Sequence, residues 1–191
     1  MENMIIKNWM VRFSNNGVSY GNFKWKNIGE WTEAPDWDSK PVYGSGLHGQ
    51  GMGGWGYCQA GSRFEFCEIS GEDFVVIDNN KIKTKKAKII GVDQDAWAML
   101  IAATQGNFQG SLNLQNYNLP LPAGFTHCGG DLDLRGYNFP LPAGFTHCGG
   151  DLYLRGYNFP LPAGFTHCGG YLYLDLQGYN FPLPAGLLYR S

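Results

Sequence analysis

A repeat of 20 residues fills the second half of this sequence and limits what the chain can fold into. The segment LPAGFTHCGG occurs three times without a substitution, at residues 121–130, 141–150 and 161–170. The full units span 119–138, 139–158 and 159–180, and the third is two residues longer than the others. A divergent unit precedes them at 110–118, and a partial unit, FPLPAGLLYRS, follows. A fixed period of this length predicts a stack of equivalent coils.

Each unit carries the pattern GG-x-L-x-L, in which the leucines occupy alternate positions. These leucines are Leu112, Leu114, Leu132, Leu134, Leu152 and Leu154. A period of two predicts a strand whose leucines share one side. The following GYNFPLPAG has no helix signal, and its prolines favour extended geometry. One unit cannot bury its own leucines, so we expect about four strands to stack into a parallel β-solenoid with a leucine spine.

The motif LPAGFxxCGGDLDLRGYNF resembles the 20-residue class of bacterial leucine-rich repeats, and resembles more closely a GG-x-L-x-L variant found in uncharacterised phage and prophage proteins. The resemblance covers about 80 residues and implies a leucine-rich-repeat-like parallel β-solenoid over residues 106–191. It implies protein–protein recognition only weakly, since a fold does not fix a function. Tyr137 and Tyr157 stand where this family usually has Asn, which puts the family's Asn ladder in doubt.

The repeats differ mainly at strand positions that point away from the leucines. That side carries the column Asn113, Asp133, Tyr153 and Tyr173, flanked by Arg135 and Arg155, and Tyr171 replaces the Asp of the preceding units. Tyrosine mixed with a few charges is typical of binding surfaces. We therefore predict a partner-binding face here; the alternative is drift at solvent-exposed positions.

Each repeat also contains an adjacent His–Cys pair, which raises the possibility of a metal or redox site. Adjacent side chains of an extended chain point in opposite directions, so one pair cannot chelate one ion. Equivalent residues of neighbouring coils would stack about 4.8 Å apart, and the stacked thiols could hold a soft metal or form one disulfide. Free cysteine is more often a small buried apolar side chain. We expect the cysteines inside the solenoid, the histidines outside, and no metal.

Residues 1–105 contain no such repeat and predict a small α+β domain of unknown function. Apolar and polar residues alternate in 9–13, 64–69 and 74–77, which indicates strands. The segment DQDAWAMLIAAT at 93–104 predicts a helix, with Asp93 as its N-cap and Gly106 after its end. Such a helix could cover the first coil of the repeat stack.

The N-terminal half contains the stretch GEWTEAPDWDSKPVYGSGLHGQGMGG at 29–54. It resembles, together with flanking segments over roughly residues 9–103, an uncharacterised domain of phages and bacteria that has an APDWD…GLHG signature. That family implies no established activity. The candidate contact residues in this stretch are Trp31, Asp36, Trp37, Asp38 and His48.

An enzyme centred on His48 is the competing hypothesis. His48 with Glu33, Asp36 and Asp38 could form an acid–base site. GSGLHG followed by Tyr57 and Glu68 is faintly similar to the His–Tyr–Glu set of ADP-ribosyltransferases, although order and spacing differ. The alternative is a purely structural role, in which His48 and the tryptophans stabilise a loop-rich domain. We assign no catalytic residue and no cofactor.

Composition narrows the classes of partner. A net charge of −2 argues against binding to nucleic acid or to an anionic membrane. No stretch approaches the length of apolar residues that a membrane span needs. Five cysteines, three of them in the repeats, do not form a disulfide framework, so we expect a cytoplasmic protein.

These observations predict a non-catalytic protein-binding module. The phage resemblance of both halves adds the hypothesis that it interferes with a host defence protein. A further alternative is self-assembly, because the last coil, with Leu172, Leu174 and Leu176, has no evident cap and could support a homodimer.

Overall fold

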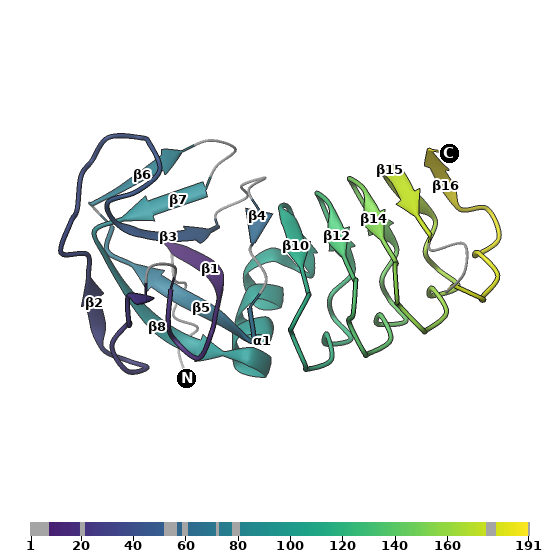
Figure 1. Ribbon diagram of the computed structural model, residues 1–191, viewed down its shortest axis with the longest axis horizontal. Coiled ribbons are helices and arrows are strands. Elements are labelled where there is room, and N and C mark those ends of the chain that lie inside the picture. The colour runs from purple at the N-terminus through teal and green to yellow at the C-terminus, as the bar shows by residue number, and fades with distance from the viewer. Residues whose placement is uncertain are drawn as a thin grey trace.

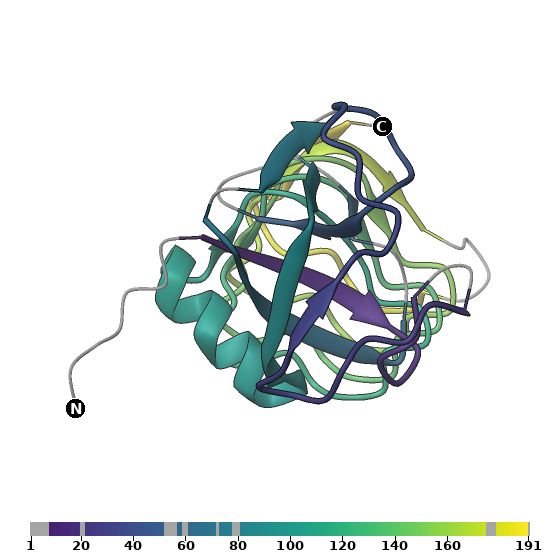
Figure 2. The ribbon, with the colours of Figure 1, turned by 90° about the vertical axis from the view of Figure 1, so that its left-hand side faces the viewer.

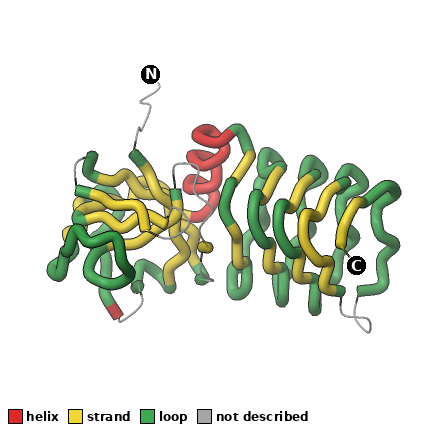
Figure 3. The backbone as a smooth tube through the Cα atoms, turned by 90° about the horizontal axis from the view of Figure 1, so that it is seen from above, coloured by secondary structure: helices red, strands yellow, loops and turns green. Residues whose placement is uncertain are grey.

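A computed structural model describes residues 8–19, 22–51, 57–58, 61–71, 73–77, 81–174 and 179–190 of the chain. An antiparallel sheet forms one end of an elongated molecule, and a β-solenoid forms the other (Figure 1). Seen along the long axis, the coils of the solenoid lie one behind another behind the N-terminal sheet (Figure 2). One helix, α1, lies between the two parts (Figure 3).

The N-terminal sheet has seven strands in the order β2-β8-β5-β1-β3-β7-β6, all paired antiparallel. Their bounds are β1 Trp9–Ser14, β2 Trp31–Glu33, β3 Leu47–Gln50, β5 Arg63–Ile69, β6 Phe74–Ile77, β7 Lys81–Thr84 and β8 Lys86–Val92. One face, with Val11 and Phe64, packs toward α1 and the solenoid. The other face, with Met10 and Cys67, packs against residues of the long loops such as Trp25. Because both faces are covered, charged side chains on these strands become buried.

Helix α1, Asp93–Thr104, has the predicted bounds, but the prediction that Asp93 caps it is wrong. Val92 is the N-cap residue, and Asp93 has a φ of 50°. The Asp93 carboxylate instead accepts a hydrogen bond of 3.0 Å from the backbone N–H of Phe64, which ties the helix to the sheet. The helix ends at Gln105 and Gly106, both in left-handed geometry.

The solenoid confirms the predicted stack of parallel strands and corrects the number of strands in each coil. The inner leucines of the pattern are fully buried, as expected. Each coil, however, contributes two short strands, because the His–Cys pair forms a strand of its own. One wall contains β10 Ser111–Asn113, β12 Leu132–Asp133 and β14 Leu152–Tyr153; the other contains β9 Asn107–Phe108, β11 His127–Cys128 and β13 His147–Cys148. Strand β15, His167–Tyr173, belongs to both walls, and β16, Leu188–Arg190, pairs with it.

The Gly–Gly corner between the two walls is required by the close approach of neighbouring coils. A Cβ atom on Gly149 would overlap the carbonyl oxygen of Gly129, and one on Gly169 would overlap that of Gly149. At the same corner, Gly149 N–H donates a hydrogen bond of 2.7 Å to the carbonyl of Cys128. Any side chain at these positions would therefore push two coils apart.

The interior of the solenoid consists of in-register columns. Phe125, Phe145 and Phe165 stack with ring centroids 5.6 and 5.5 Å apart. The next column consists of tyrosines, whose hydroxyl groups bind the backbone of the preceding coil. Leu121 N–H donates to the Tyr137 hydroxyl oxygen at 2.9 Å, and that hydroxyl donates to the Leu119 carbonyl at 3.1 Å.

This tyrosine contact repeats along the stack. The hydroxyl oxygens of Tyr157 and Tyr179 accept hydrogen bonds from Leu141 N–H and Leu161 N–H, at 2.9 and 3.0 Å. The positions that depart from the leucine-rich-repeat pattern thus hold a tyrosine ladder, which satisfies turn N–H groups that would otherwise be buried without a partner.

A single apolar core crosses the sequence boundary near residue 105. Trp97 is fully buried and stacks on Phe64 of the sheet at 4.0 Å, and its ring also meets Phe125 of the solenoid edge-on at 5.5 Å. The backbone of β4, Tyr57–Cys58, pairs in parallel with β10 and so extends one solenoid wall with a strand from the N-terminal half. The two halves therefore differ in their sequence pattern but share one core.

We predict that Tyr137→Phe lowers the free energy of unfolding by about 1–3 kcal/mol, because it leaves the buried Leu121 N–H without an acceptor. Urea denaturation measures this change. Tyr189→Phe is the matched control, because Tyr189 is 44% exposed, and it should change stability by less than about 0.5 kcal/mol. Equal stabilities of the two variants would contradict a role for the ladder.

Candidate functional site

The four residues that the sequence placed in one variable column do lie in line along one wall of the solenoid. Asn113 pairs in register with Asp133, Asp133 with Tyr153, and Tyr153 with Tyr173. All four residues lie on the wall formed by β10, β12, β14 and β15. Residues that are 20 positions apart in the sequence therefore lie next to one another in a continuous line of side chains.

Exposure changes along this column, and the expectation of an exposed face fails at its first two residues. Asn113 and Asp133 are only 6% and 5% exposed. The Asn113 side chain accepts a hydrogen bond of 2.9 Å from Gln115 N–H. The Asp133 carboxylate accepts bonds from the backbone N–H and the guanidinium of Arg135, with an ion-pair distance of 2.5 Å. These two residues stabilise their own turns.

The last two residues of the column form an aromatic surface in which Tyr153 is half-buried and Tyr173 is exposed. The rings of Tyr153 and Tyr173 are 4.7 Å apart and nearly parallel, at 3°. The Arg135 guanidinium lies 5.4 Å above the Tyr153 ring. These three side chains, with Arg155 and Leu174, line a shallow hollow of about 330 Å³. We call these five residues the tyrosine hollow.

Arg155 differs from Arg135 because its coil has no aspartate at the matching position. In the coil of Arg135, Asp133 neutralises the guanidinium, whereas Tyr153 occupies the corresponding place before Arg155. Arg155 is exposed and forms no ion pair within the described ranges. The Asp-to-Tyr difference between two repeats therefore adds an aromatic ring and releases one positive charge.

Tyr171 ends a second ladder at the edge of the same wall. Asp131 N–H donates to the Ser111 hydroxyl oxygen, Asp151 N–H to the Asp131 carboxylate, and Tyr171 N–H to the Asp151 carboxylate, at 2.9, 2.8 and 2.8 Å. Each acidic side chain thus accepts the N–H of the next coil. Tyr171 is 47% exposed and lies beside Tyr173, with ring centroids 6.0 Å apart.

The His–Cys pairs separate as predicted. Cys128, Cys148 and Cys168 are buried, and their thiols donate to the carbonyl oxygens of Gly110, Gly130 and Gly150 in the preceding coil. Burial raises the pKa of the Cys128 thiol to about 12, so this thiol stays protonated and a poor nucleophile. The described part of the chain has no cluster of three or more His, Cys, Asp or Glu side chains suited to a metal ion.

The three histidines form a partly exposed column on the opposite wall. The ring centroids of His127 and His147 are 5.1 Å apart, and those of His147 and His167 are 4.6 Å apart. The pKa of His147 is lowered by partial burial and then by the charges of its two neighbours. The lowered pKa of His147 favours its neutral imidazole within the stack.

The acidic, Trp-rich stretch of the N-terminal half does not form one cluster. Trp31 lies beneath Lys88, whose Nζ is 4.7 Å from the ring centroid. Trp37 packs against the core, with Lys83 Nζ 5.7 Å from its ring. Asp38 accepts a hydrogen bond from Lys40 N–H, and Glu33 pairs with Lys85. These side chains bind local partners rather than converge on one ligand.

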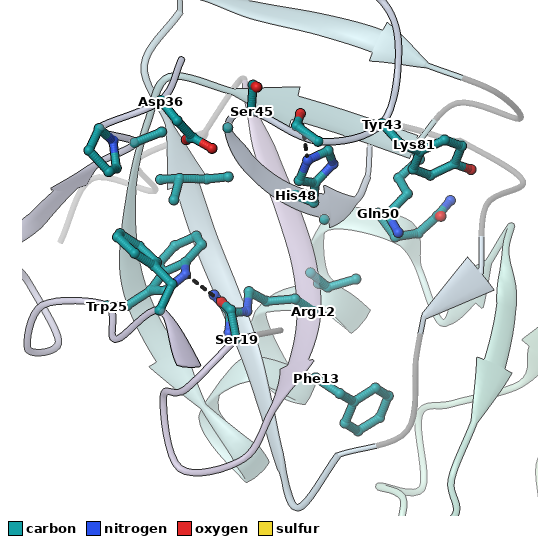
Figure 4. A pocket seen from close by; sticks show the side chains of 18 residues that line it. Arg12, Phe13, Ser19, Trp25, Asp36, Tyr43, Ser45, His48, Gln50 and Lys81 are labelled. Carbon is teal, nitrogen blue, oxygen red and sulfur yellow. Dashed lines mark hydrogen bonds between the residues drawn. The ribbon is translucent and has the colours of Figure 1, made fainter. Parts of the chain in front are cut away.

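Asp36 and His48, in contrast, line a common cleft of about 660 Å³ in the N-terminal sheet (Figure 4). His48 Nε2 lies 3.3 Å from the Gly44 carbonyl oxygen, and the pKa of His48 is lowered by burial and then by Lys81. Glu68 does not line the cleft and pairs with Lys88 at 2.7 Å. The Tyr57 side chain lies outside the described residues.

The glycines beside His48 have a packing role. A Cβ on Gly49 would lie 2.5 Å from the sulfur of Met10, and one on Gly51 would overlap the Trp9 carbonyl oxygen. They permit the end of β3 to lie close beside β1 in the same sheet.

Sequence reasoning missed a buried ionic cluster behind this cleft. Glu65 is fully buried, and Arg12 is 6% exposed. Arg12 Nε lies 3.2 Å from the Glu65 carboxylate, which also binds Arg63 and accepts a hydrogen bond of 2.6 Å from Ser14. The available signal was weak: Arg12 alternates with apolar residues in β1, as Arg63, Glu65 and Glu68 do in part in β5.

Comparisons of this chain with known protein families, with curated proteins and with solved structures each found no match. No helix among the described residues is long and apolar enough to cross a membrane. The candidate sites therefore rest on their own geometry.

We predict that the stability of the protein falls as the pH drops below about 6.5, the ordinary pKa of histidine. The lowered pKa of His147 means that the unfolded chain binds the proton more tightly than the folded chain does, so the folded state loses stability on acidification. Urea midpoints at neutral and mildly acidic pH measure the effect.

The control is His147→Gln, which retains His48 and every other titrating group. Its loss of stability over the same pH interval should be smaller than that of the natural protein. Identical losses in the two proteins would show that the histidine column does not contribute.

Proposed function

We propose that the protein is a non-catalytic binding protein that recognises a protein partner through the tyrosine hollow. The observation that carries this proposal is the pair of parallel tyrosine rings beside an exposed arginine without an ion-pair partner among the described residues. Tyrosine and arginine are, with tryptophan, the side chains enriched at binding hot spots. The free charge of Arg155 favours an acidic segment on the partner.

The rest of the solenoid supports this assignment of the hollow. Asn113 and Asp133 hold turns, the cysteines fill the interior, and the aspartate ladder joins the coils. The two tyrosine rings stack between neighbouring coils, and the Tyr153 hydroxyl donates a hydrogen bond of 3.2 Å to the Asp151 carboxylate, but both rings keep a face or edge on the hollow. Arg155 forms no ion pair among the described residues. On the phage resemblance of both halves, we extend the proposal to a host protein as the partner, with a defence protein as the favoured class.

The test compares the natural protein with the triple variant Tyr153→Ala, Tyr173→Ala, Arg155→Ala in pull-downs from bacterial lysate. The bound protein is then purified for titration. We expect the variant to lose at least about 30-fold in affinity, since one hot-spot side chain alone is worth about 2 kcal/mol.

The matched control is the double variant His147→Ala, His167→Ala, which removes a stacked ring pair from the same two coils on the other wall. It should bind as the natural protein does. A partner that both variants retain equally would refute the hollow as its binding site.

A second candidate function is self-association through the last strand of the solenoid. Strand β16 pairs with β15 along one edge. Two of its side chains, Leu188 and Tyr189, are 68% and 44% exposed. Leu172 and Leu174, which the sequence suggested as the exposed residues, pack instead against the core, and Leu176 lies outside the described residues.

Sedimentation velocity tests this second candidate. Self-association predicts a dimer whose fraction rises with concentration and falls in the variant Leu188→Lys, which places a charge on the exposed edge. A monomer at every concentration would exclude it and leave the tyrosine hollow unaffected.

A further inference from the structure

The cleft of the N-terminal sheet opens where two neighbouring strands separate. Strand β1 pairs with β5 through six residues but is in register with β3 only at Val11 and Gln50. Toward His48 no further residue pair joins these two strands among the described residues, and side chains from both strands and from the loop before β3 line the space there. Its volume of about 660 Å³ is in the range of sites for small molecules.

One wall of the cleft contains a buried cation. The Arg12 guanidinium lies over the Trp25 ring, with 4.1 Å between its Cζ atom and the ring centroid. Its Nε faces Glu65, but its Nη1 is buried and has no hydrogen-bond partner in the described part of the chain. A buried N–H of a charged group is costly to leave without an acceptor.

The charges behind this wall do not balance. The single carboxylate of Glu65 is shared by two guanidinium groups, those of Arg12 and Arg63, and by the hydroxyl of Ser14. Two positive charges against one negative charge leave the cluster with a net charge of +1. An anion placed in the cleft would complete it and would accept the unused N–H of Arg12.

His48 supplies a second unused atom in the same cleft. Its Nε2 faces the Gly44 carbonyl oxygen at 3.3 Å, so in the neutral ring this nitrogen carries the proton and donates. The remaining nitrogen, Nδ1, is then an acceptor, and it is buried without a partner among the described residues. A complementary ligand carries a hydrogen-bond donor as well as an anion.

Apolar and aromatic side chains form the rest of the lining. They include Phe13, Phe23, Trp25, Tyr43 and Leu47 (Figure 4). Asp36 and Lys81 also line the cleft, and their charges offset each other. With Asp36 present and a net charge of +1 to complement, a singly charged carboxylate fits better than a doubly charged phosphate.

From these features we infer that the cleft binds a small carboxylate with an aromatic body and a hydrogen-bond donor, with its anion on Arg12 and its donor on His48 Nδ1. The site is separate from the tyrosine hollow and shares no residue with it. The chemistry of the ligand is equally that of a free aromatic acid or of an aromatic residue at the C-terminus of a peptide.

Isothermal titration with indole-3-acetate tests the inference, since this probe combines the carboxylate, the ring and an N–H donor. We expect a dissociation constant of about 1 mM or tighter. Indole-3-acetamide, which lacks the charge, should bind at least about tenfold more weakly. 1-Methylindole-3-acetate, which lacks the donor, should bind more weakly than the parent, and adenosine monophosphate should not compete.

Two variants connect the binding to the named atoms. Arg12→Gln should lose at least about tenfold in affinity for indole-3-acetate, with its fold checked by circular dichroism. His48→Phe keeps the ring but removes Nδ1, so it should bind the parent and the 1-methyl compound equally. Arg155→Gln, in the tyrosine hollow, is the control and should bind indole-3-acetate as the natural protein does.

Three results would overturn the inference. The first is no binding of indole-3-acetate at about 10 mM, well above the expected dissociation constant. The second is equal binding of the acid and the amide. The third is unchanged affinity for indole-3-acetate in a folded Arg12→Gln or in His48→Phe. Either result would show that the probe does not bind the atom that the variant removes.

A dipeptide that ends in tryptophan, compared with its C-terminal amide, distinguishes the two sources of the carboxylate. Tighter binding of the dipeptide acid than of indole-3-acetate assigns the cleft to peptide termini, whereas weaker binding assigns it to free acids. Both outcomes support a carboxylate on Arg12.

Discussion

The whole solenoid depends on the placement of one indole ring, that of Trp97. Its faces and edges meet Phe64 of the sheet and Phe125 of the first full repeat. Its N–H donates a hydrogen bond of 2.9 Å to the Tyr117 hydroxyl oxygen. In later coils a backbone N–H fills that role, from Leu121 toward Tyr137 and from Leu141 toward Tyr157. The helix therefore presents to the first coil the donor that every other coil receives from its neighbour.

After the first coil, ladders of hydrogen bonds hold the coils together, and each ladder uses one side chain from each repeat. The tyrosine hydroxyls, the cysteine thiols and the carboxylates of Asp131 and Asp151 all bind the backbone of an adjacent coil. Stability in such a stack is approximately a sum of nearest-neighbour terms. This explains why the tyrosine and cysteine positions are identical in the full repeats, whereas the aspartate position changes to Tyr171 in the last of them.

The sequence predicts the solenoid well because its period and its buried leucines are local signals. The second strand of each coil was missed because two residues, such as His127 and Cys128, are too few to show an alternating pattern. The tyrosine ladder was visible only as a departure from the Asn of a known repeat. Burial of Asp133 by Arg135 could not be read from the chain, because it depends on the conformation of one turn.

The cleft was less predictable than the solenoid because its residues come from distant segments. His48 and Asp36 were identified, but Arg12 alternates with Val11 and Phe13 in a way that is typical of a strand with one solvent-exposed face. The loops that carry Trp25 and Ala34 cover that second face and bury the guanidinium. No local pattern in the sequence predicts that these loops cover the second face of the sheet.

The number of repeats sets the distance between the two candidate sites of the molecule. Coils whose strands pair in the same register separate the tyrosine hollow from the N-terminal cleft. Duplication of the unit 119–138, which would again place an arginine equivalent to Arg135 beside Tyr153, would move the hollow by one strand spacing, about 4.8 Å, and leave the residues of both sites in place. The spacing between the two sites is therefore set in fixed increments by the number of repeats.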